Sequence, residues 1–123
     1  MRPEEFGREL EVFWERADKD GDRAKDSQLA LSELESFYRG LDEKEREFAL
    51  GMFVDWILGS DSRRQFAGLA MIDRFLIRAA LEPLRQLAAS LENASGPSAP
   101  YAWAKVNRII GRLAGQSVPD DVD

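Results

Sequence analysis

Five consecutive residues, Asp18-Lys19-Asp20-Gly21-Asp22, have the types and spacing that could bind a metal ion. They match the first, third and fifth positions of an EF-hand calcium loop, where oxygen ligands are required. Asp26 suits the ninth position, but two essential positions do not match: Arg23 stands where the sharp turn needs glycine, and Leu29 stands where a bidentate glutamate is needed. Lys25 adds a positive charge beside the carboxylates. The pattern therefore favours a solvated turn between two helices, with no metal bound.

The sequence contains few of the residue types that most often carry out catalysis. The 123-residue chain contains no histidine and no cysteine. It therefore lacks the commonest general base, the commonest metal ligand and the thiol nucleophile. Carboxylate, lysine, serine and tyrosine chemistry remain open. We expect a non-enzymatic protein with no catalytic residues and no cofactor.

Charge is distributed unevenly along the chain, whose formal net charge is −6. Residues 1–60 hold 9 Lys/Arg and 16 Asp/Glu, a net of −7, whereas residues 61–119 hold 8 and 4, a net of +4. Asp120, Asp121 and Asp123 supply the remaining −3. An acidic half argues against a general nucleic-acid-binding protein, which needs a positive surface to release counterions. An acidic half is instead suited to binding a basic protein partner. The alternative explanation is that the negative charge only keeps the protein soluble.

Apolar residues recur at spacings of three and four along most of the chain, which predicts an all-α fold without strands. We expect one domain over residues 1–115, with about six helices in antiparallel pairs. The pairs would form a HEAT-like right-handed superhelix or a compact bundle. The predicted helices cover residues 3–17, begin again near Asp26 or Ser27, Asp42, Asp61 and Ala79, and end with a helix from Pro100 or Tyr101 to Gly115. Gln116–Asp123 is expected to be an acidic, disordered tail.

The third predicted helix has a polar start and an apolar end. Asp42 and Glu45 have the spacing of a capping box, in which each side chain accepts a bond from the other's backbone N–H. The following run, Phe48–Leu58, is apolar except for Gly51 and Asp55, which predicts a central helix packed on most sides. Asp55 has two interpretations. It is either buried and paired with a downstream arginine such as Arg74 or Arg78, or it lies on a narrow exposed stripe.

The first turns of two later helices carry unusual side chains. Arg63 and Arg64 follow Asp61 at a helix start, where positive charge opposes the helix dipole. Tyr101 and Trp103 lie at the start of the last helix, after a loop rich in Gly, Pro and Ser. We expect this aromatic pair to dock onto the preceding helix; an exposed pair would instead be a recognition site.

Residues 60–113 resemble HEAT-type helical repeats. The segments that carry this resemblance are Ser60–Asp61, Ala67–Ile72, Ala80–Leu87, and Val106, Ile109, Ile110 and Leu113. Together with Trp56–Asp61 and Ala99–Ile110, the pattern is similar to small HEAT-like proteins that bacteria encode beside secreted polymorphic toxins. Proteins of this kind are thought to be immunity proteins that bind and block a cognate toxin. The resemblance implies the same role for this chain.

These observations predict a protein-binding module, with an immunity protein directed at a basic toxin domain as its specific form. The candidate partner-binding residues are Asp18, Asp20, Asp22, Tyr38, Asp42, Glu43 and Glu47. The alternatives are a self-associating scaffold and a carboxylate-based, metal-dependent enzyme. We expect no nucleic-acid or membrane partner, and a cytoplasmic location, because the N-terminus lacks the apolar segment of a signal peptide. The oligomeric state stays open.

Overall fold

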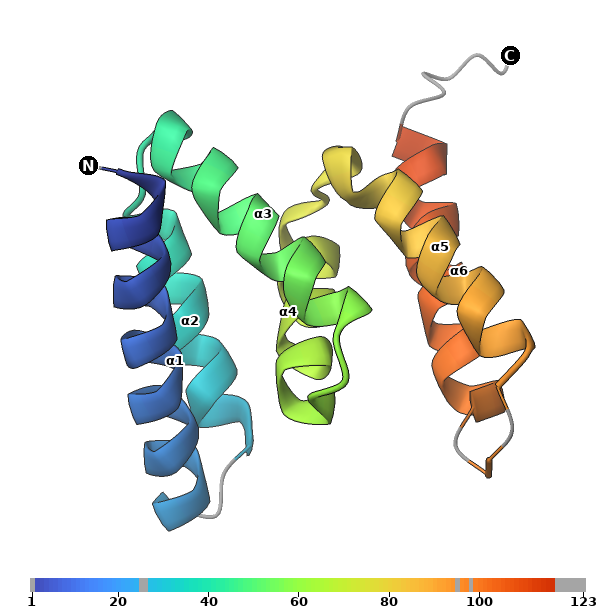
Figure 1. The fold of residues 1–123 in the computed structure, drawn as a ribbon, viewed down its shortest axis with the longest axis horizontal. Coiled ribbons are helices and arrows are strands. Elements are labelled where there is room, and N and C mark those ends of the chain that lie inside the picture. Colours follow the sequence, from blue (N-terminus) through green and yellow to red (C-terminus); the bar gives the residue numbers. More distant parts are fainter. Residues whose placement is uncertain (1, 25–26, 95, 98, 117–123) are drawn as a thin grey trace. The chain divides into compact units, whose positions relative to one another are not determined.

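A computed structural model describes residues 2–24, 27–94, 96–97 and 99–116 of the chain. Within these residues there are six α-helices, one short 3₁₀ turn and no strand, which confirms the all-α prediction (Figure 1). The elements are α1 (Pro3–Ala24), α2 (Ser27–Arg39), α3 (Glu43–Leu58), α4 (Ser62–Phe75), η1 (Arg78–Ala80), α5 (Leu81–Glu92) and α6 (Ala99–Gln116). The finer expectation of a HEAT-like superhelix stays a prediction.

The helices form two compact units, an N-terminal unit (Met1–Met52) and a C-terminal unit (Phe53–Asp123), with the boundary inside α3. The charge asymmetry follows this division. Residues 1–52 hold 9 Lys/Arg and 15 Asp/Glu, a net of −6, whereas residues 53–116 hold 8 and 5, a net of +3. Among the described helices, none has both the length and the apolar character needed to span a bilayer. The acidic tail predicted for Gln116–Asp123 lies outside the described residues, except for Gln116, which ends α6.

In the N-terminal unit, α1 and α2 pack against each other as an antiparallel pair (Figure 1). Phe6 of α1 joins this pair to the start of α3. Its ring centroid lies 6.2 Å from that of Phe37 in α2 and 5.8 Å from that of Phe48 in α3. Tilted ring pairs at these distances are favourable beyond the area that they bury. The three elements therefore share one aromatic core.

The turn predicted at Asp18–Asp22 is wrong, because α1 continues through these residues to Ala24. The reason is visible in the buried face of the helix. Leu10, Trp14 and Ala17 are buried, and Gly21 continues the same face four residues later. A glycine within a helix costs about 1 kcal/mol relative to alanine. Packing of this face against α2 is sufficient to extend the helix over it.

The start of α3 is the predicted capping box. The backbone N–H of Glu45 donates to Asp42 Oδ1 at 2.8 Å, and the backbone N–H of Asp42 donates to Glu45 Oε1 at 3.0 Å. Further along, α3 is less buried than its apolar sequence suggests. Gly51, Asp55 and Leu58 form an exposed stripe at spacings of four and three. Of the two interpretations of Asp55, the exposed stripe is therefore the correct one.

In the C-terminal unit, α4 packs closely on the second half of α3. A Cβ added at Gly68 would lie 2.9 Å from Ile57 Cγ2 and 3.1 Å from the carbonyl oxygen of Phe53. The Gln65 amide donates to the carbonyl oxygen of Ile57 at 2.9 Å, which satisfies an acceptor near the end of α3. Leu76 ends α4 in the left-handed conformation, with φ of 50°. The chain then enters η1, and α5 and α6 form the last helix pair.

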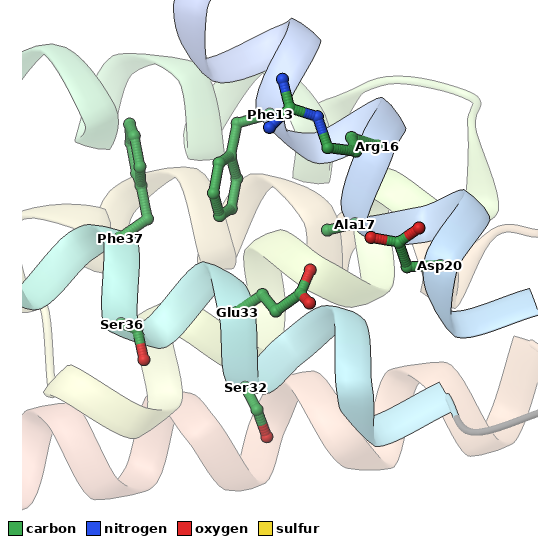
Figure 2. Close-up of a pocket in the computed structure, with 8 residues that line it drawn as sticks. All are labelled: Phe13, Arg16, Ala17, Asp20, Ser32, Glu33, Ser36 and Phe37. Carbon is green, nitrogen blue, oxygen red and sulfur yellow. The ribbon is translucent and has the colours of Figure 1, made fainter. Parts of the chain in front are cut away.

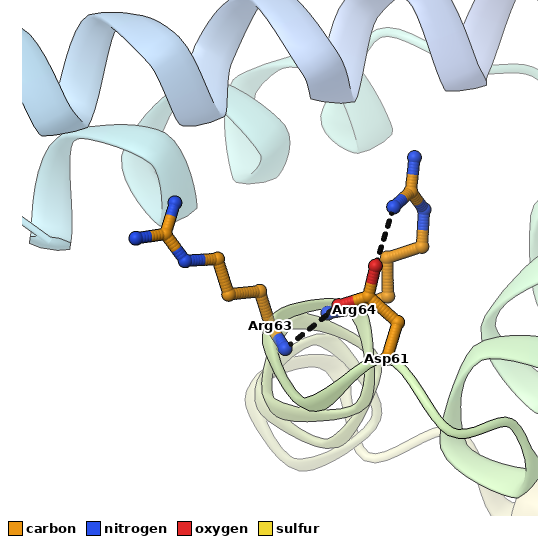
Figure 3. A network of polar contacts seen from close by, with 3 residues as sticks. All are labelled: Asp61, Arg63 and Arg64. Carbon is orange, nitrogen blue, oxygen red and sulfur yellow. Dashed lines mark hydrogen bonds and ion pairs between the residues drawn. The ribbon is translucent and has the colours of Figure 1, made fainter.

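Asp61 caps the N-terminus of α4 and explains the two arginines that follow it (Figure 3). Its Oδ1 accepts the backbone N–H groups of Arg63 and Arg64 at 3.0 and 3.2 Å. Its Oδ2 accepts Arg64 Nη1 at 2.7 Å. The carboxylate therefore places negative charge at the positive end of the helix dipole and pairs with an arginine that would otherwise oppose that dipole.

These contacts make the stability of the cap depend on pH. Hydrogen bonds from the backbone and side chain of Arg64 hold the pKa of Asp61 below its ordinary value of 3.8. Stabilisation by this group is complete above the ordinary pKa and is lost as the pH falls through the lower pKa of the folded protein. We expect Asp61→Asn to lower the melting temperature at about pH 7 and to have a smaller effect at about pH 2.5. Thermal denaturation at both values tests this. Ser62→Ala is the control, since its effect should not vary with pH.

Candidate functional site

The structure separates the predicted partner-binding residues into two groups at opposite ends of the α1–α2 pair. Asp42, Glu43 and Glu47 are exposed at the start of α3, beside the end of the pair where Phe6 and Phe37 meet. Asp18 and Asp20 lie toward the other end of α1, twelve or more residues beyond Phe6. At a rise of about 1.5 Å per residue, this is a separation of about 18 Å along the helix. The seven residues therefore do not form one site.

The helical conformation also separates Asp18 from Asp20. Residues two apart in an α-helix project about 200° apart around its axis. Asp20 projects toward α2 and lines a groove there, whereas Asp18 lies on another face of α1. The backbone of Asp22 continues α1, and its side chain lies outside the described part of the structure.

Tyr38 is a core residue, with only 6% of its surface exposed. Its burial raises the pKa of the phenol, and the charge of Arg46 partly opposes this effect. The guanidinium carbon of Arg46 lies 4.9 Å from the centre of the Tyr38 ring, in cation–π geometry. The ring of this predicted partner-binding residue is thus covered, and Arg46 lies over it.

The groove that contains Asp20 runs between α1 and α2 (Figure 2). Phe13 and Phe37 stand together in it, with ring centroids 4.6 Å apart and ring planes tilted by 30°. Glu33 extends from α2 toward the α1 side of the groove, where Asp20 lies. The residues that line the groove are Phe13, Arg16, Ala17, Asp20, Ser32, Glu33, Ser36 and Phe37. The groove therefore combines an aromatic floor with two carboxylates and one guanidinium.

This combination suits a basic side chain from another molecule. The aliphatic stem of a lysine or arginine can lie along the two partly buried phenylalanine rings. Its charged head can then bond to Asp20 and Glu33, and an arginine can also stack on the rings. Ser32 and Ser36 also line the groove. They can hydrogen-bond to the backbone of a bound segment.

Sequence reasoning identified one member of this groove, Asp20, and missed the others. Phe13 and Phe37 belong to the apolar pattern that predicts the core faces of their helices, and both are only half-buried. Glu33 and Arg16 are polar residues on the flanks of those faces. In the sequence of one helix, a half-exposed aromatic residue beside a carboxylate is only a weak indication of a binding site. The site forms only when two such helices pack together.

The aromatic pair near the start of α6 does not behave as one unit. Tyr101 is 81% exposed, so docking onto the preceding helix is wrong for this residue. Trp103, two residues later, projects to the other flank of α6 and lines a small groove with Leu91 and Pro100. Trp103 remains 38% exposed, so it is covered in part, whereas Tyr101 is not. Phe66 of α4 is also exposed, although it belongs to the apolar pattern of its helix, and the Lys105 ammonium lies over its ring.

Acidic residues do not converge into a metal site in the part of the chain that the structure describes. There, no group of three or more Asp and Glu side chains is placed to hold an ion. At Asp18 and Asp20 the helical conformation points the two carboxylates in different directions.

Comparison of the sequence with models of known families and with curated proteins gave no match, and comparison of the fold with solved structures gave none. The α1–α2 groove and the charge difference between the two units are therefore the features of this protein that bear on its function.

Proposed function

We propose that this chain is a non-enzymatic protein-binding module that holds a basic segment of a partner protein in the α1–α2 groove. The observation that carries the proposal is the groove itself, where Phe13 and Phe37 lie next to Asp20 and Glu33. Such a groove gives both affinity and selectivity for arginine or lysine. Its aromatic rings contact the stem of the basic side chain, and its carboxylates bind the charged head.

The charge of the N-terminal unit supports the same partner chemistry. Its net charge of −6 attracts a basic protein over distances of about a Debye length, roughly 10 Å at 0.1 M salt. Asp42, Glu43 and Glu47 add to this field from the start of α3. They contribute to the rate of encounter, and the groove provides the contact that selects the partner.

The resemblance to small HEAT-like immunity proteins makes a bacterial toxin domain the first partner class to test. A toxin that acts on nucleic acid carries a basic surface, and an acidic protein that covers this surface blocks its substrate. In this role the chain is expressed together with the toxin and protects the cell that makes both.

We expect the chain to bind the product of a neighbouring toxin gene and to restore growth when the two are co-expressed. The double variant Asp20→Lys, Glu33→Lys should bind at least about tenfold more weakly and lose this protection, because it repels a basic segment. Titration calorimetry and growth on inducing plates measure the two effects. Asp55→Lys is the matched control, since Asp55 is an exposed acid on α3 outside the groove.

Two results would count against the proposal. Binding of the toxin domain by the double variant with wild-type affinity would remove the groove from the interface. A neighbouring product that neither binds the chain nor is neutralised by it would remove the immunity role.

A further inference from the structure

The outer side of α6 carries positive charge, and no residue of this helix is acidic. Its sequence, Ala99–Gln116, contains one lysine, two arginines and no aspartate or glutamate. The three cations and one tyrosine follow one another at spacings of four, three and four, so they lie along one face of the helix. These residues are Tyr101, Lys105, Arg108 and Arg112, and we call them the α6 face. Lys105 is half-buried, and the other three are exposed.

The cations at the two ends of this row have contacts inside the C-terminal unit. The Lys105 ammonium lies 4.1 Å from the centre of the Phe66 ring of α4. Arg112 pairs with Asp73 of the same helix. Arg108 stands between them and has no ion pair with a carboxylate in the part of the chain that the structure describes. The contacts with α4 therefore hold the outer two cations in place and leave the central one open to another molecule.

Lys105 and Arg108 are close enough for one acidic group to bind both. Side chains three residues apart on a helix are neighbours, with Cβ atoms about 5–6 Å apart. Burial lowers the pKa of Lys105, and the charge of Arg108 lowers it further, while Asp73 acts in the opposite direction. A carboxylate that approaches both cations would offset their repulsion and stabilise the charged form of Lys105.

Two exposed aromatic rings add apolar surface beside these charges. Tyr101 is 81% exposed, and Phe66 is 42% exposed. Aromatic residues and arginine are the residue types enriched where proteins bind one another. Tyr101 lies one turn before Lys105, so its ring can contact an apolar side chain next to the acidic group, and its hydroxyl can donate a hydrogen bond to that group.

We propose that the α6 face binds an acidic segment of a partner protein, with carboxylates against Lys105 and Arg108 and an apolar side chain against Tyr101. Charge complementarity determines this choice of partner, because residues 53–116 have a net charge of +3 and α6 has no acidic residue. The α1–α2 groove belongs to the other unit and takes the opposite charge. This proposal therefore does not rest on the proposed function, and it gives the chain a second binding surface.

Nucleic acid is a less suitable partner for the same surface. Proteins that bind single strands place several aromatic rings along a positive groove, so that successive bases stack on them. On this surface Lys105 already lies over the Phe66 ring, which leaves Tyr101 as the open ring of the α6 face. The net charge of −6 on the whole chain also repels a phosphate backbone. A short acidic protein segment carries less charge and is repelled less.

Fluorescence anisotropy of the full chain with a short fluorescein-labelled peptide of glutamate and leucine tests the proposal. We expect saturable binding that salt weakens. Arg108→Glu should weaken this binding about tenfold, because it reverses the charge at the centre of the α6 face. Arg85→Glu is the matched control, since it makes the same change of charge at an exposed residue of α5. It should bind the peptide like wild type.

A variant that keeps the charge separates a specific surface from general attraction. Tyr101→Ala removes a ring that is largely in solvent, so the variant should fold like wild type, as circular dichroism would show. It should nevertheless weaken peptide binding about fivefold through loss of the aromatic contact. Its dependence on salt should match that of wild type, because no charge has changed.

The proposal is overturned if the peptide does not bind, or if Arg108→Glu and Arg85→Glu weaken binding equally. Wild-type affinity of Tyr101→Ala would remove the ring from the site. A labelled oligothymidylate that binds more tightly than the peptide would overturn the choice of a protein partner. The groove variant Asp20→Lys, Glu33→Lys should bind the peptide at least as tightly as wild type, so a failure here is distinguishable from a failure of the groove.

Discussion

Replacement of Phe53 by alanine is expected to lower the free energy of unfolding by about 3–5 kcal/mol, the range for removal of a fully buried phenylalanine. The Phe53 ring is 1% exposed and lies 5.6 Å from the Trp56 ring, centroid to centroid. Its removal takes away both apolar burial and this ring contact. Small domains have a total stability of about 5–15 kcal/mol, so the variant would lose a large part of it. Urea denaturation followed by circular dichroism measures the change.

Leu58 provides the control for this prediction on the same helix. It is 45% exposed, so Leu58→Ala removes little buried surface and should cost about 0.5 kcal/mol or less. Equal losses for the two variants would show that the ring of Phe53 is not in the core of the C-terminal unit.

Gly68→Ala is expected to destabilise the protein by about 1–2 kcal/mol, although alanine favours helix over glycine by about 1 kcal/mol. The added Cβ would be 2.9 Å from Ile57 Cγ2, closer than such atoms pack. Ile57 is fully buried and β-branched, so its side chain has little freedom to move away. The carbonyl oxygen of Phe53, at 3.1 Å, belongs to the backbone of α3 and is equally fixed.

Gly51→Ala is the matched control, because Gly51 also lies within a helix but a Cβ there would meet nothing within 4 Å. It should stabilise the protein by about 1 kcal/mol through helix propensity alone. Opposite signs for the two variants in thermal or urea denaturation would confirm that α3 and α4 touch at Gly68. A stabilising Gly68→Ala would contradict the close approach.

The core positions Phe53 and Gly68 and the groove residues lie in different units of the protein. Phe53 and Gly68 lie in the interior of the C-terminal unit, whereas Asp20 and Glu33 line a groove of the N-terminal unit. Folding of each binding variant can therefore be checked by circular dichroism before its affinity is interpreted. A variant that folds normally and fails to bind reports on the groove itself.

The sequence by itself determined the helices and most of their ends. Periodic apolar residues predicted six helices, and the capping residues Asp42 and Asp61 marked two of the starts. These features are local: an apolar face repeats every three or four residues, and a cap bonds to backbone groups two or three residues away. Such contacts form between neighbours along the chain, so their pattern can be recognised in one sequence.

Tertiary structure alone decided which side chains are covered and which surfaces exist. The extension of α1 through Asp18–Asp22, the burial of Tyr38 and the exposure of Asp55 and Tyr101 all depend on packing between helices. The groove of the N-terminal unit exists because α1 and α2 place Phe13 beside Phe37. Contacts of this kind join residues far apart in the chain. The periodicity of a single helix shows which face is apolar, and only the helix packed against it decides how much of that face is covered.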